Sequence, residues 1–409
     1  TVRALLFQDV DQAAPTLTRP LQRRVVTGRK MQDLNVVVII MEGQANEPVG
    51  ALGHGQTHTP ELDEICAGGM FFEQLYATGA RTSRGVTGVL VGHPDLGGIT
   101  LLERDEALGN FQTLPGVMRS RGYRTMFITG GDPDYDNMKD FLTAAGTETI
   151  VGQEQLGPQY AGAFGVPDEL IFQKAHEMFT SLGKQKFFAA ILTVSNHQPY
   201  TIPQGRTDML PDDSDENRML NAYRYADWAL GEFFREARQA DYFRNTVFVI
   251  VADHGHGEYL QLNLAIDAPG YRLPCVFYAP GIISPQTIST LASQTDIAPT
   301  LLGMLGGTYE HSFLGRDIRR VAPGDGFALL HEDRHIALLR PGRVLVTGPV
   351  NRRSQPRAVP EMFHVTASNM LPVGPGLLNP VETETMRRDL LSLYGVALQQ
   401  YLNVKKKGN

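Results

Sequence analysis

The sequence predicts an α/β fold with a mainly parallel, doubly wound sheet that is flanked by helices on both faces. Two observations lead to this prediction. Short apolar runs rich in β-branched residues, such as NVVVIIM at Asn35–Met41, are typical of parallel strands buried on both faces. Longer segments with helical periodicity separate these runs, and this alternation is the pattern of βαβ units.

The elements follow in a regular order along the chain. Strands are expected at Asn35–Met41, Arg124–Thr129, Phe187–Val194, Thr246–Ala252 and Leu273–Tyr278. Helices are expected between them at Pro60–Ala67, Leu114–Arg121, Asp136–Ala145, Asp168–Leu182 and Asp215–Ala240. The last helix has the clearest apolar stripe.

The prediction divides the chain into three parts. Residues 1–34 mix apolar and polar residues and end in a basic patch, so we interpret them as a linker of the juxtamembrane kind, with an amphipathic helix as the alternative. Residues 35–318 form the main α/β domain. Residues 319–409 hold Pro- and Arg-rich stretches and a final helix at Glu382–Leu402. This last part is predicted as a smaller α+β subdomain packed on the same core.

Composition excludes several classes of protein. The 409 residues are 42% apolar and 20% charged, which is ordinary for a globular protein with a sizeable core. A formal net charge of −7 argues against a nucleic-acid partner. The two cysteines, Cys66 and Cys275, lack metal-ligand spacing. Two buried free thiols are the favoured interpretation, and a single disulfide is the alternative.

Polar side chains follow three of the predicted strands. Glu42 comes directly after the first strand, the segment S-N-H-Q-P-Y with His197 follows the third, and Asp253 and His254 follow the fourth. In an open parallel sheet these ends share one edge, where active sites gather. Two carboxylates and an imidazole suit Mn²⁺, Mg²⁺ or Zn²⁺. The alternative is that Asp253 caps a turn and His254 packs against it.

A hydroxyl group is predicted at the start of a helix near these residues. Thr82 lies in the small-residue segment T-G-A-R-T-S-R-G, which leads into an apolar run. A helix N-terminus favours anions, and a metal ion touching the hydroxyl would make its alkoxide accessible near neutral pH. Thr82 is therefore a candidate nucleophile. A plain N-cap is the alternative.

The motifs N-V-V-V-I-I-M-E-G, G-A-R-T-S-R-G, S-N-H-Q-P-Y, V-A-D-H-G-H-G-E and S-Q-T-D-I-A-P-T occur in the order seen in the sulfatase/alkaline-phosphatase superfamily. The chain most resembles its lipoteichoic acid synthase and periplasmic phosphoglycerol transferase branch, from about Asn35 to Ile318. The resemblance implies an alkaline-phosphatase/sulfatase-like catalytic domain. It also implies one divalent metal ion, Mn²⁺ with Mg²⁺ or Zn²⁺ as alternatives, held by Glu42, Thr82, Asp253 and His254. Aspartate 296 of the last motif is expected only to start a helix.

The resemblance further implies a set of substrate-binding residues. His197 is expected to contact the substrate phosphate. Residues 131–138 resemble a loop that lines the glycerol-phosphate pocket, where lipoteichoic acid synthases carry a Trp and an Arg and this sequence has Tyr135 and Asn137. Arg84 can bind a phosphate oxygen or form a salt bridge on the helix surface, and His256 can face the pocket or satisfy a loop carbonyl.

Departures from other branches narrow the expectation. Thr82 stands where sulfatases carry a modified Cys, Met41-Glu42 replaces two adjacent Asp, and the second-site Asp-x-x-x-His of two-metal phosphatases does not occur at its expected place. A single metal ion is therefore expected. Phosphoethanolamine transferases share the Glu, Thr and Asp-His set but are usually richer in disulfides.

The activity that the resemblance implies is transfer of phosphoglycerol, or a similar headgroup phosphate, from a phospholipid donor to a glycan or polyol-phosphate acceptor. The enzyme would be extracytoplasmic, periplasmic or at the cell surface, and membrane-anchored in the full-length protein. Two alternatives stay open: a phosphodiesterase or phosphatase that resolves the same intermediate with water, and a non-catalytic lipid-binding sensor.

Overall fold

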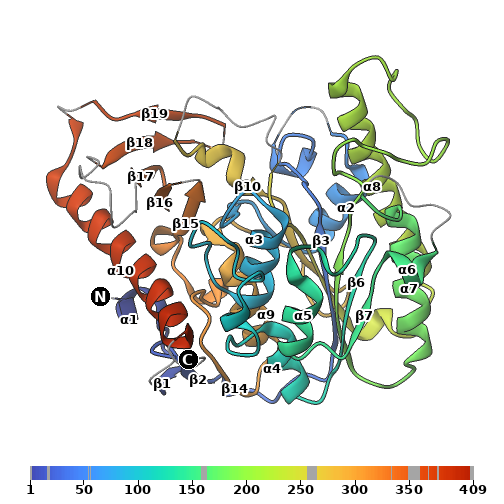
Figure 1. Cartoon of the computed structure of the whole chain (residues 1–409), viewed down its shortest axis with the longest axis horizontal. Helices are drawn as coiled ribbons and strands as arrows, with labels where there is room; N and C mark the ends of the chain where they lie inside the picture. Colours follow the sequence, from blue (N-terminus) through green and yellow to red (C-terminus); the bar gives the residue numbers. More distant parts are fainter. Residues whose placement is uncertain are drawn as a thin grey trace.

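An eight-stranded sheet forms the centre of the computed structural model, in the order β12-β4-β11-β9-β3-β8-β6-β7 (Figure 1). The structure describes residues 2–15, 19–53, 55, 57–157, 164–255, 265–332, 334–348, 360–366, 368–374 and 377–405. Five neighbouring strands are parallel: β9 (Thr246–Ala252), β3 (Asn35–Met41), β8 (Phe187–Leu192), β6 (Arg124–Thr129) and β7 (Thr149–Val151). The other three strands are β11 (Cys275–Tyr278), β4 (Met70–Phe72) and β12 (Gln286–Ile288), and β11 is antiparallel to both of its neighbours.

Both faces of the sheet are covered by helices. Alternate residues of β3 enter different cores: Val36, Val38 and Ile40 one, and Val37, Ile39 and Met41 the other. The first core includes residues of α3 (Thr82–Val86), α4 (Leu114–Ser120), α5 (Met138–Ala144) and α9 (Ile297–Leu305). The second includes residues of α2 (Pro60–Gly68), α7 (Asp168–Ser181) and α8 (Asp215–Ala237). The predicted mainly parallel, doubly wound sheet is confirmed.

Three element boundaries differ from the prediction, each for a local reason. The expected strand at 273–278 is split into β10 (Arg272–Leu273), which pairs with β5 (Leu75–Tyr76), and β11. Pro274 lies between them and has no N–H group for a strand ladder. Strand β8 ends at Leu192 because the amides of Val194 and Ser195 donate to the side chain of Asp168. Helix α5 begins at Met138 because the two residues before it have positive φ.

The C-terminal part contains a second, antiparallel sheet beside the main one. Its strands are β15 (Ala328–Glu332), β16 (His335–Arg340), β17 (Arg343–Thr347), β18 (Glu361–Val365) and β19 (Met370–Pro372). The long helix α10 (Pro380–Lys405) packs against this sheet and forms a core with it (Figure 1). The α+β character predicted for this part is confirmed, while the exact boundaries between parts stay predictions.

The N-terminal residues pack against the rest of the chain. They form α1 (Val2–Leu6), β1 (Asp11–Ala13) and β2 (Arg23–Val26), and β2 pairs with β14 (Thr308–His311). Arg23, one of the basic-patch residues, is buried and donates to the carbonyl oxygen of Leu6 at 3.0 Å. Within the described residues, no helix combines the length and apolar character required to cross a bilayer.

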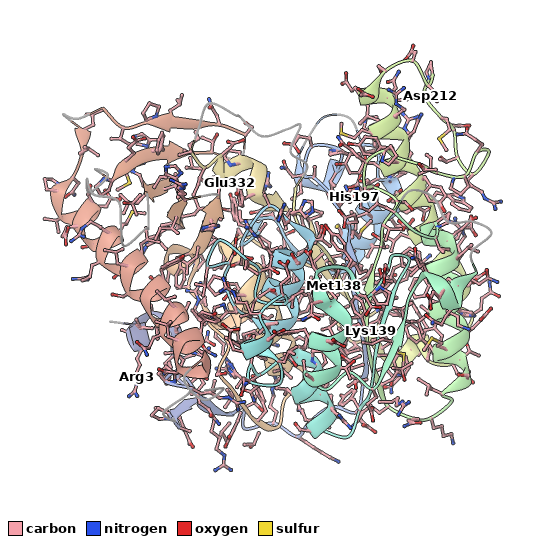
Figure 2. All side chains as sticks on the ribbon, in the orientation of Figure 1. Arg3, Met138, Lys139, His197, Asp212 and Glu332 are labelled. Carbon is pink, nitrogen blue, oxygen red and sulfur yellow. The ribbon has the colours of Figure 1, made fainter. Side chains whose placement is uncertain are left out.

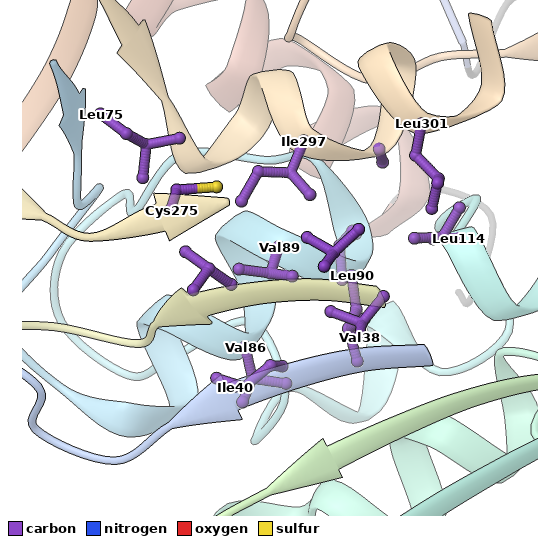
Figure 3. Close-up of a cluster of buried hydrophobic side chains, with 14 of the residues drawn as sticks. Val38, Ile40, Leu75, Val86, Val89, Leu90, Leu114, Cys275, Ile297 and Leu301 are labelled. Atoms are coloured by element: carbon purple, nitrogen blue, oxygen red, sulfur yellow. The ribbon is translucent and has the colours of Figure 1, made fainter. Parts of the chain in front are cut away.

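The helix that begins at Thr82 is anchored deep in the first core. Helix α3 continues without a break into a π-helical turn, η2 (Thr87–Val91). Val86, Val89 and Leu90 of this continuous segment pack between β3 and α9 (Figure 3). The position of Thr82 is therefore set by the core rather than by a surface loop.

Both cysteines are buried free thiols, Cys66 in α2 and Cys275 in β11, as the sequence favoured. Burial raises the pKa of each thiol well above its ordinary value, so the reactive thiolate is scarce in the folded protein. We expect Ellman's reagent to modify neither cysteine in native buffer and both in guanidinium chloride. Fast modification of either thiol in the native protein would contradict this placement.

Candidate active site

Two neighbouring strands bring three candidate metal ligands together. Strands β3 and β9 are parallel, and Met41 pairs with Ala252, so the residues that follow them emerge side by side. The Nε2 atom of His254 lies 3.5 Å from Oε1 of Glu42 and 3.5 Å from Oδ2 of Asp253. One ligand atom from each residue can be chosen so that all three lie within 4.8 Å of one another. The strand ends therefore form one compact cluster of two carboxylates and one imidazole.

The donor atoms of this cluster fit a divalent cation. Asp253 is fully buried, and its Oδ1 accepts hydrogen bonds from the N–H groups of Gly43 at 2.8 Å and His254 at 2.7 Å. Its Oδ2 is buried with no hydrogen-bond partner among the described residues. Nδ1 of His254 lies 2.7 Å from the carbonyl oxygen of Gly255 and donates its proton there, so Nε2 is the nitrogen that could give a lone pair to a cation once its own proton is lost. A buried carboxylate oxygen without a donor calls for a positive partner.

The pKa values of Glu42, Asp253 and His254 also indicate that a positive charge is favourable at this place. Burial, with the nearby carboxylate of Glu42, raises the pKa of Asp253 to about 8. Burial also acts to raise the pKa of Glu42, but the hydrogen bond and charge of His254 outweigh it, so this pKa lies below its usual value. Burial would lower the pKa of His254, yet Asp253 and Glu42 raise it to about 10. The carboxylates of Asp253 and Glu42 therefore favour a positively charged group beside them, which can be the imidazolium of His254 or a cation.

The hydroxyl of Thr82 lies beside this cluster. Thr82 is the first residue of α3, and its Oγ1 donates a hydrogen bond to Oε2 of Glu42 at 3.1 Å. Helix α3 lies directly against the end of β9 at Gly85, where a Cβ atom would overlap the carbonyl oxygen of Asp253 and lie 2.7 Å from its Cα. Only glycine allows the helix to approach so closely. The candidate nucleophile and the candidate ligands are thus held at one edge of the sheet.

Two adjoining cavities open onto Thr82. The first has a volume of about 430 Å³ and the second about 260 Å³. Both are lined by Glu42, Thr82, Tyr135 and His197. The first is completed by Gly43, Ala80, Arg81, Asp136, Asn196, Gln198 and His254. The second is completed by Thr129, Gly131, Asp132, Met138, Gln153, Phe164, Leu192, Thr193 and Val194. His197 and Met138, both of which line the second cavity, are labelled in Figure 2.

His197 is oriented by its own loop. Its Nδ1 lies 2.7 Å from the carbonyl oxygen of Gln198, and its ring stacks on Phe164 with centroids 3.4 Å apart. The start of the loop is held by Asp168, whose Oδ1 accepts from the N–H groups of Val194 at 2.9 Å and Ser195 at 3.1 Å. Burial raises the pKa of Asp168 to about 6. With Nδ1 carrying the proton, Nε2 of His197 is the nitrogen that can meet a substrate.

The remaining predicted site residues lie in different surroundings. Tyr135 is 58% exposed and lines both cavities, so it can touch a ligand. Asn137 has a φ of 59° and donates its side-chain amide to the carbonyl oxygen of Leu102 at 2.9 Å, and it lines neither cavity. Arg84 pairs with Asp95 at 2.9 Å and also lies outside both cavities, which is the geometry of the salt-bridge alternative. His256 lies outside the described residues.

Several lining residues escaped the sequence prediction. Thr129 ends β6, so the rule that sites gather at strand ends could have indicated it. Asp132 belongs to the segment 131–138 that the resemblance places at the pocket, and it lines the second cavity. Arg81 directly precedes Thr82 and lines the first cavity. Gln153 begins the short helix α6 (Gln153–Leu156) and Phe164 lies in a turn, and no pattern in the sequence marks either residue.

Comparison with known proteins identifies a family and solved structures to which this chain is similar. The family model described as Sulfatase matches residues 34–307. The chain is similar to a solved structure of a protein in the alkaline phosphatase superfamily from Vibrio parahaemolyticus, with a TM-score of 0.86, 28% identity, and coverage of 98% of this chain and 95% of that one. It is also similar in fold to the lipoteichoic acid synthase LtaP from Listeria monocytogenes, with a TM-score of 0.76, 20% identity, and coverage of 91% and 93%.

Sequence comparison with curated proteins finds relatives that are named lipoteichoic acid synthase and phosphoglycerol transferase. Lipoteichoic acid synthase 2 of Bacillus subtilis is 23% identical over 232 residues, covering 52% of this chain and 35% of that protein. Phosphoglycerol transferase I of Xanthomonas axonopodis is 27% identical over 221 residues, covering 50% of this chain and 31% of that protein. The chain thus spans less than half the length of these relatives.

Proposed function

Because the chain belongs to the sulfatase family, we propose that it is a metal-dependent phosphotransferase that works through a covalent intermediate on Thr82. It would move phosphoglycerol, or a similar headgroup phosphate, from a membrane phospholipid to a glycan or polymer acceptor. One observation carries the proposal: the hydroxyl of Thr82 meets a cluster of Glu42, Asp253 and His254 where two cavities join. The relatives named lipoteichoic acid synthase and phosphoglycerol transferase support the choice of reaction.

Glu42, Asp253 and His254, together with the hydroxyl of Thr82, would hold one divalent metal ion. Mn²⁺ is our choice, and Mg²⁺ or Zn²⁺ would also accept oxygen and imidazole ligands. When bound, the ion supplies positive charge that lowers the pKa of the threonine hydroxyl and offsets charge on the phosphate. The buried, unpaired Oδ2 of Asp253 supports this assignment.

Thr82 and His197 would carry the two chemical steps. In the first step, the hydroxyl of Thr82 loses its proton as its oxygen attacks phosphorus, the bond from phosphorus to the diacylglycerol oxygen breaks, and the diacylglycerol oxygen takes up a proton. In the second step, an acceptor hydroxyl attacks phosphorus and loses its proton, and Thr82 leaves with a proton restored. His197 lines both cavities from its loop, and its Nε2 can bind the phosphate or deliver the proton.

The two cavities offer separate places for two groups on phosphorus. The smaller cavity is lined by the polar side chains of Thr129, Asp132 and Gln153 and suits a hydroxylated headgroup. The larger cavity is lined by Arg81, a cation, and suits the departing lipid and the incoming acceptor. Because the donor is a membrane lipid, we place the domain beside the outer face of a bilayer, as part of a membrane-anchored protein.

Arg81 provides a test of the larger cavity. It is the one arginine or lysine among the described residues that line the two cavities. We expect Arg81→Gln to raise the KM for an anionic donor roughly tenfold, the loss of one charge-assisted hydrogen bond, with a smaller change in kcat. Arg244→Gln, at an exposed arginine of η6 (Phe243–Asn245), is the matched control. An unchanged KM in Arg81→Gln would remove Arg81 from substrate binding.

A hydrolase is the second candidate, because a water molecule could replace the acceptor in the second step. Among similar folds is the phosphonate monoester hydrolase SpPMH from Silicibacter pomeroyi, with a TM-score of 0.64 and 14% identity. The first step is the same for both functions. The fate of the intermediate without an acceptor therefore separates them.

One experiment tests the proposed function. Fluorescent phosphatidylglycerol is incubated with the protein and Mn²⁺, or with EDTA, while diacylglycerol release and the intact mass of the protein are followed. We expect metal-dependent release and a glycerophosphoryl adduct on Thr82 that persists until an acceptor is added. Continuous release of glycerol phosphate without an acceptor would identify a hydrolase. Lipid binding without release, in protein shown to contain metal, would leave the non-catalytic sensor.

A further inference from the structure

A buried glutamine connects the candidate ligands to the candidate nucleophile. Gln294 begins η9 (Gln294–Asp296) and is fully buried. Its Nε2 donates to the carbonyl oxygens of Ala252 at 2.9 Å and Asp253 at 2.6 Å. Its Oε1 accepts from the N–H group of Thr78 at 3.0 Å. One side-chain amide therefore bridges the end of β9 and the segment that leads to Thr82.

The same side chain also supports the helix that Thr82 begins. A Cβ atom on Gly88, in η2, would lie 3.0 Å from both Cβ and Oε1 of Gln294. Thr78, four residues before Thr82, is held by the amide, and Gly88, six residues after Thr82, lies against the same side chain. Gln294 thus touches the chain on both sides of the nucleophile.

The turn that carries Gln294 is itself held firmly. The N–H group of Ser293 donates to Oδ2 of Asp296 at 2.9 Å, and the N–H group of Arg316 donates to Oδ1 of the same carboxylate at 2.7 Å. The next helix, α9, is buried in the core. Gln294 therefore reaches the site from a turn that is anchored by these hydrogen bonds and by the core.

We infer that Gln294 is a positioning residue that sets the separation between Thr82 and the metal ligands, an inference that rests on the proposed function. Only an uncharged amide fits the place, because the bridge needs one acceptor and two donated hydrogen bonds within one buried side chain. A carboxylate would set its oxygens against two carbonyl oxygens, and an apolar side chain would leave all three backbone groups without their partner. Gln294 does not touch the reacting atoms in this assignment.

A double-mutant cycle that measures metal affinity tests this role without the use of turnover. The Kd for Mn²⁺ is measured for the wild-type protein, Thr82→Ala, Gln294→Met and the double variant. If Thr82 is held at the ligands, Thr82→Ala weakens Mn²⁺ binding about tenfold in the wild-type background and less than about twofold in the Gln294→Met background. Gln400→Met is the matched control, because Gln400 is also buried but lies in α10, and it should preserve the tenfold effect.

Kinetics supply a second readout. In Gln294→Met, kcat for lipid cleavage should fall about 10²-fold while the KM stays within about threefold, because substrate still binds but the nucleophile is misplaced. If Gln294→Met does not fold, Gly88→Ala replaces it. The added methyl group would crowd the side chain of Gln294, and it should likewise remove the effect of Thr82→Ala on Mn²⁺ binding. Equal effects of Thr82→Ala in both backgrounds, or no effect in either, would overturn the inference. The phosphatidylglycerol assay on wild-type protein decides the proposed function separately.

Discussion

Replacement of Thr82 by alanine is expected to abolish the covalent adduct and to lower turnover by at least about 10³-fold, as removal of a nucleophile does in other covalent enzymes. The fold should persist, because the one hydrogen bond that the hydroxyl donates goes to Glu42 and the helix is anchored by apolar residues behind it. Intact-mass measurement after incubation with phosphatidylglycerol and Mn²⁺ checks the adduct, and thermal unfolding checks the fold.

Thr82→Ser is the matched control for this variant. It keeps the hydroxyl and should keep both a measurable rate and an adduct. Turnover of Thr82→Ala at a rate near that of the wild-type protein, with Mn²⁺ bound, would exclude the covalent mechanism. Loss of turnover in Thr82→Ala with an adduct on another residue would show that the nucleophile had been misassigned.

Replacement of Gly85 by alanine is expected to reduce activity about 10²-fold, the cost of displacing a reacting group by about 1 Å. The new methyl group would overlap backbone atoms of Asp253, which cannot move aside because β9 is a central strand. Helix α3 must therefore shift and carry Thr82 away from Glu42. Steady-state kinetics at saturating Mn²⁺, together with Mn²⁺ titration, measure the two consequences.

Gly395→Ala is the control for the substitution itself. Gly395 lies in α10 with no atom within 4 Å of the added Cβ, so alanine there should leave activity unchanged and stabilise the helix by roughly 0.5–1 kcal/mol. Activity of Gly85→Ala equal to that of Gly395→Ala would show that the contact between α3 and Asp253 does not position the site.

The central sheet was predictable because its strands are continuous apolar runs. A run such as that of β3, in which all seven residues are buried, has few other ways to fold. Once β3 and β9 are neighbours, their register alone brings Glu42 beside Asp253 and His254. The cluster of candidate ligands could therefore be predicted from residues that are more than 200 positions apart.

Long-range partners of single polar side chains could not be predicted in the same way. The amide of Gln294 joins segments 216 and 41 residues away, and no periodicity records such a contact. Asn137 was expected at the substrate, but the left-handed backbone turns its amide to Leu102. For Arg84 the sequence leaves both phosphate binding and a salt bridge open, and only the fold places Asp95 beside it. Local patterns set the elements, whereas these choices depend on the assembled fold.

The placement of the candidate ligands at the ends of β3 and β9 has a consequence for how the site behaves in solution. Both strands lie in the interior of the sheet with helices over each face, and such strands open only when the whole molecule unfolds. Their amide protons should be among the slowest in the protein to exchange with deuterium. Glu42, Asp253 and His254 should therefore keep their relative positions up to the temperature at which the whole molecule unfolds. Heating is expected to abolish activity by global unfolding, and not by a local loss of these residues from the site.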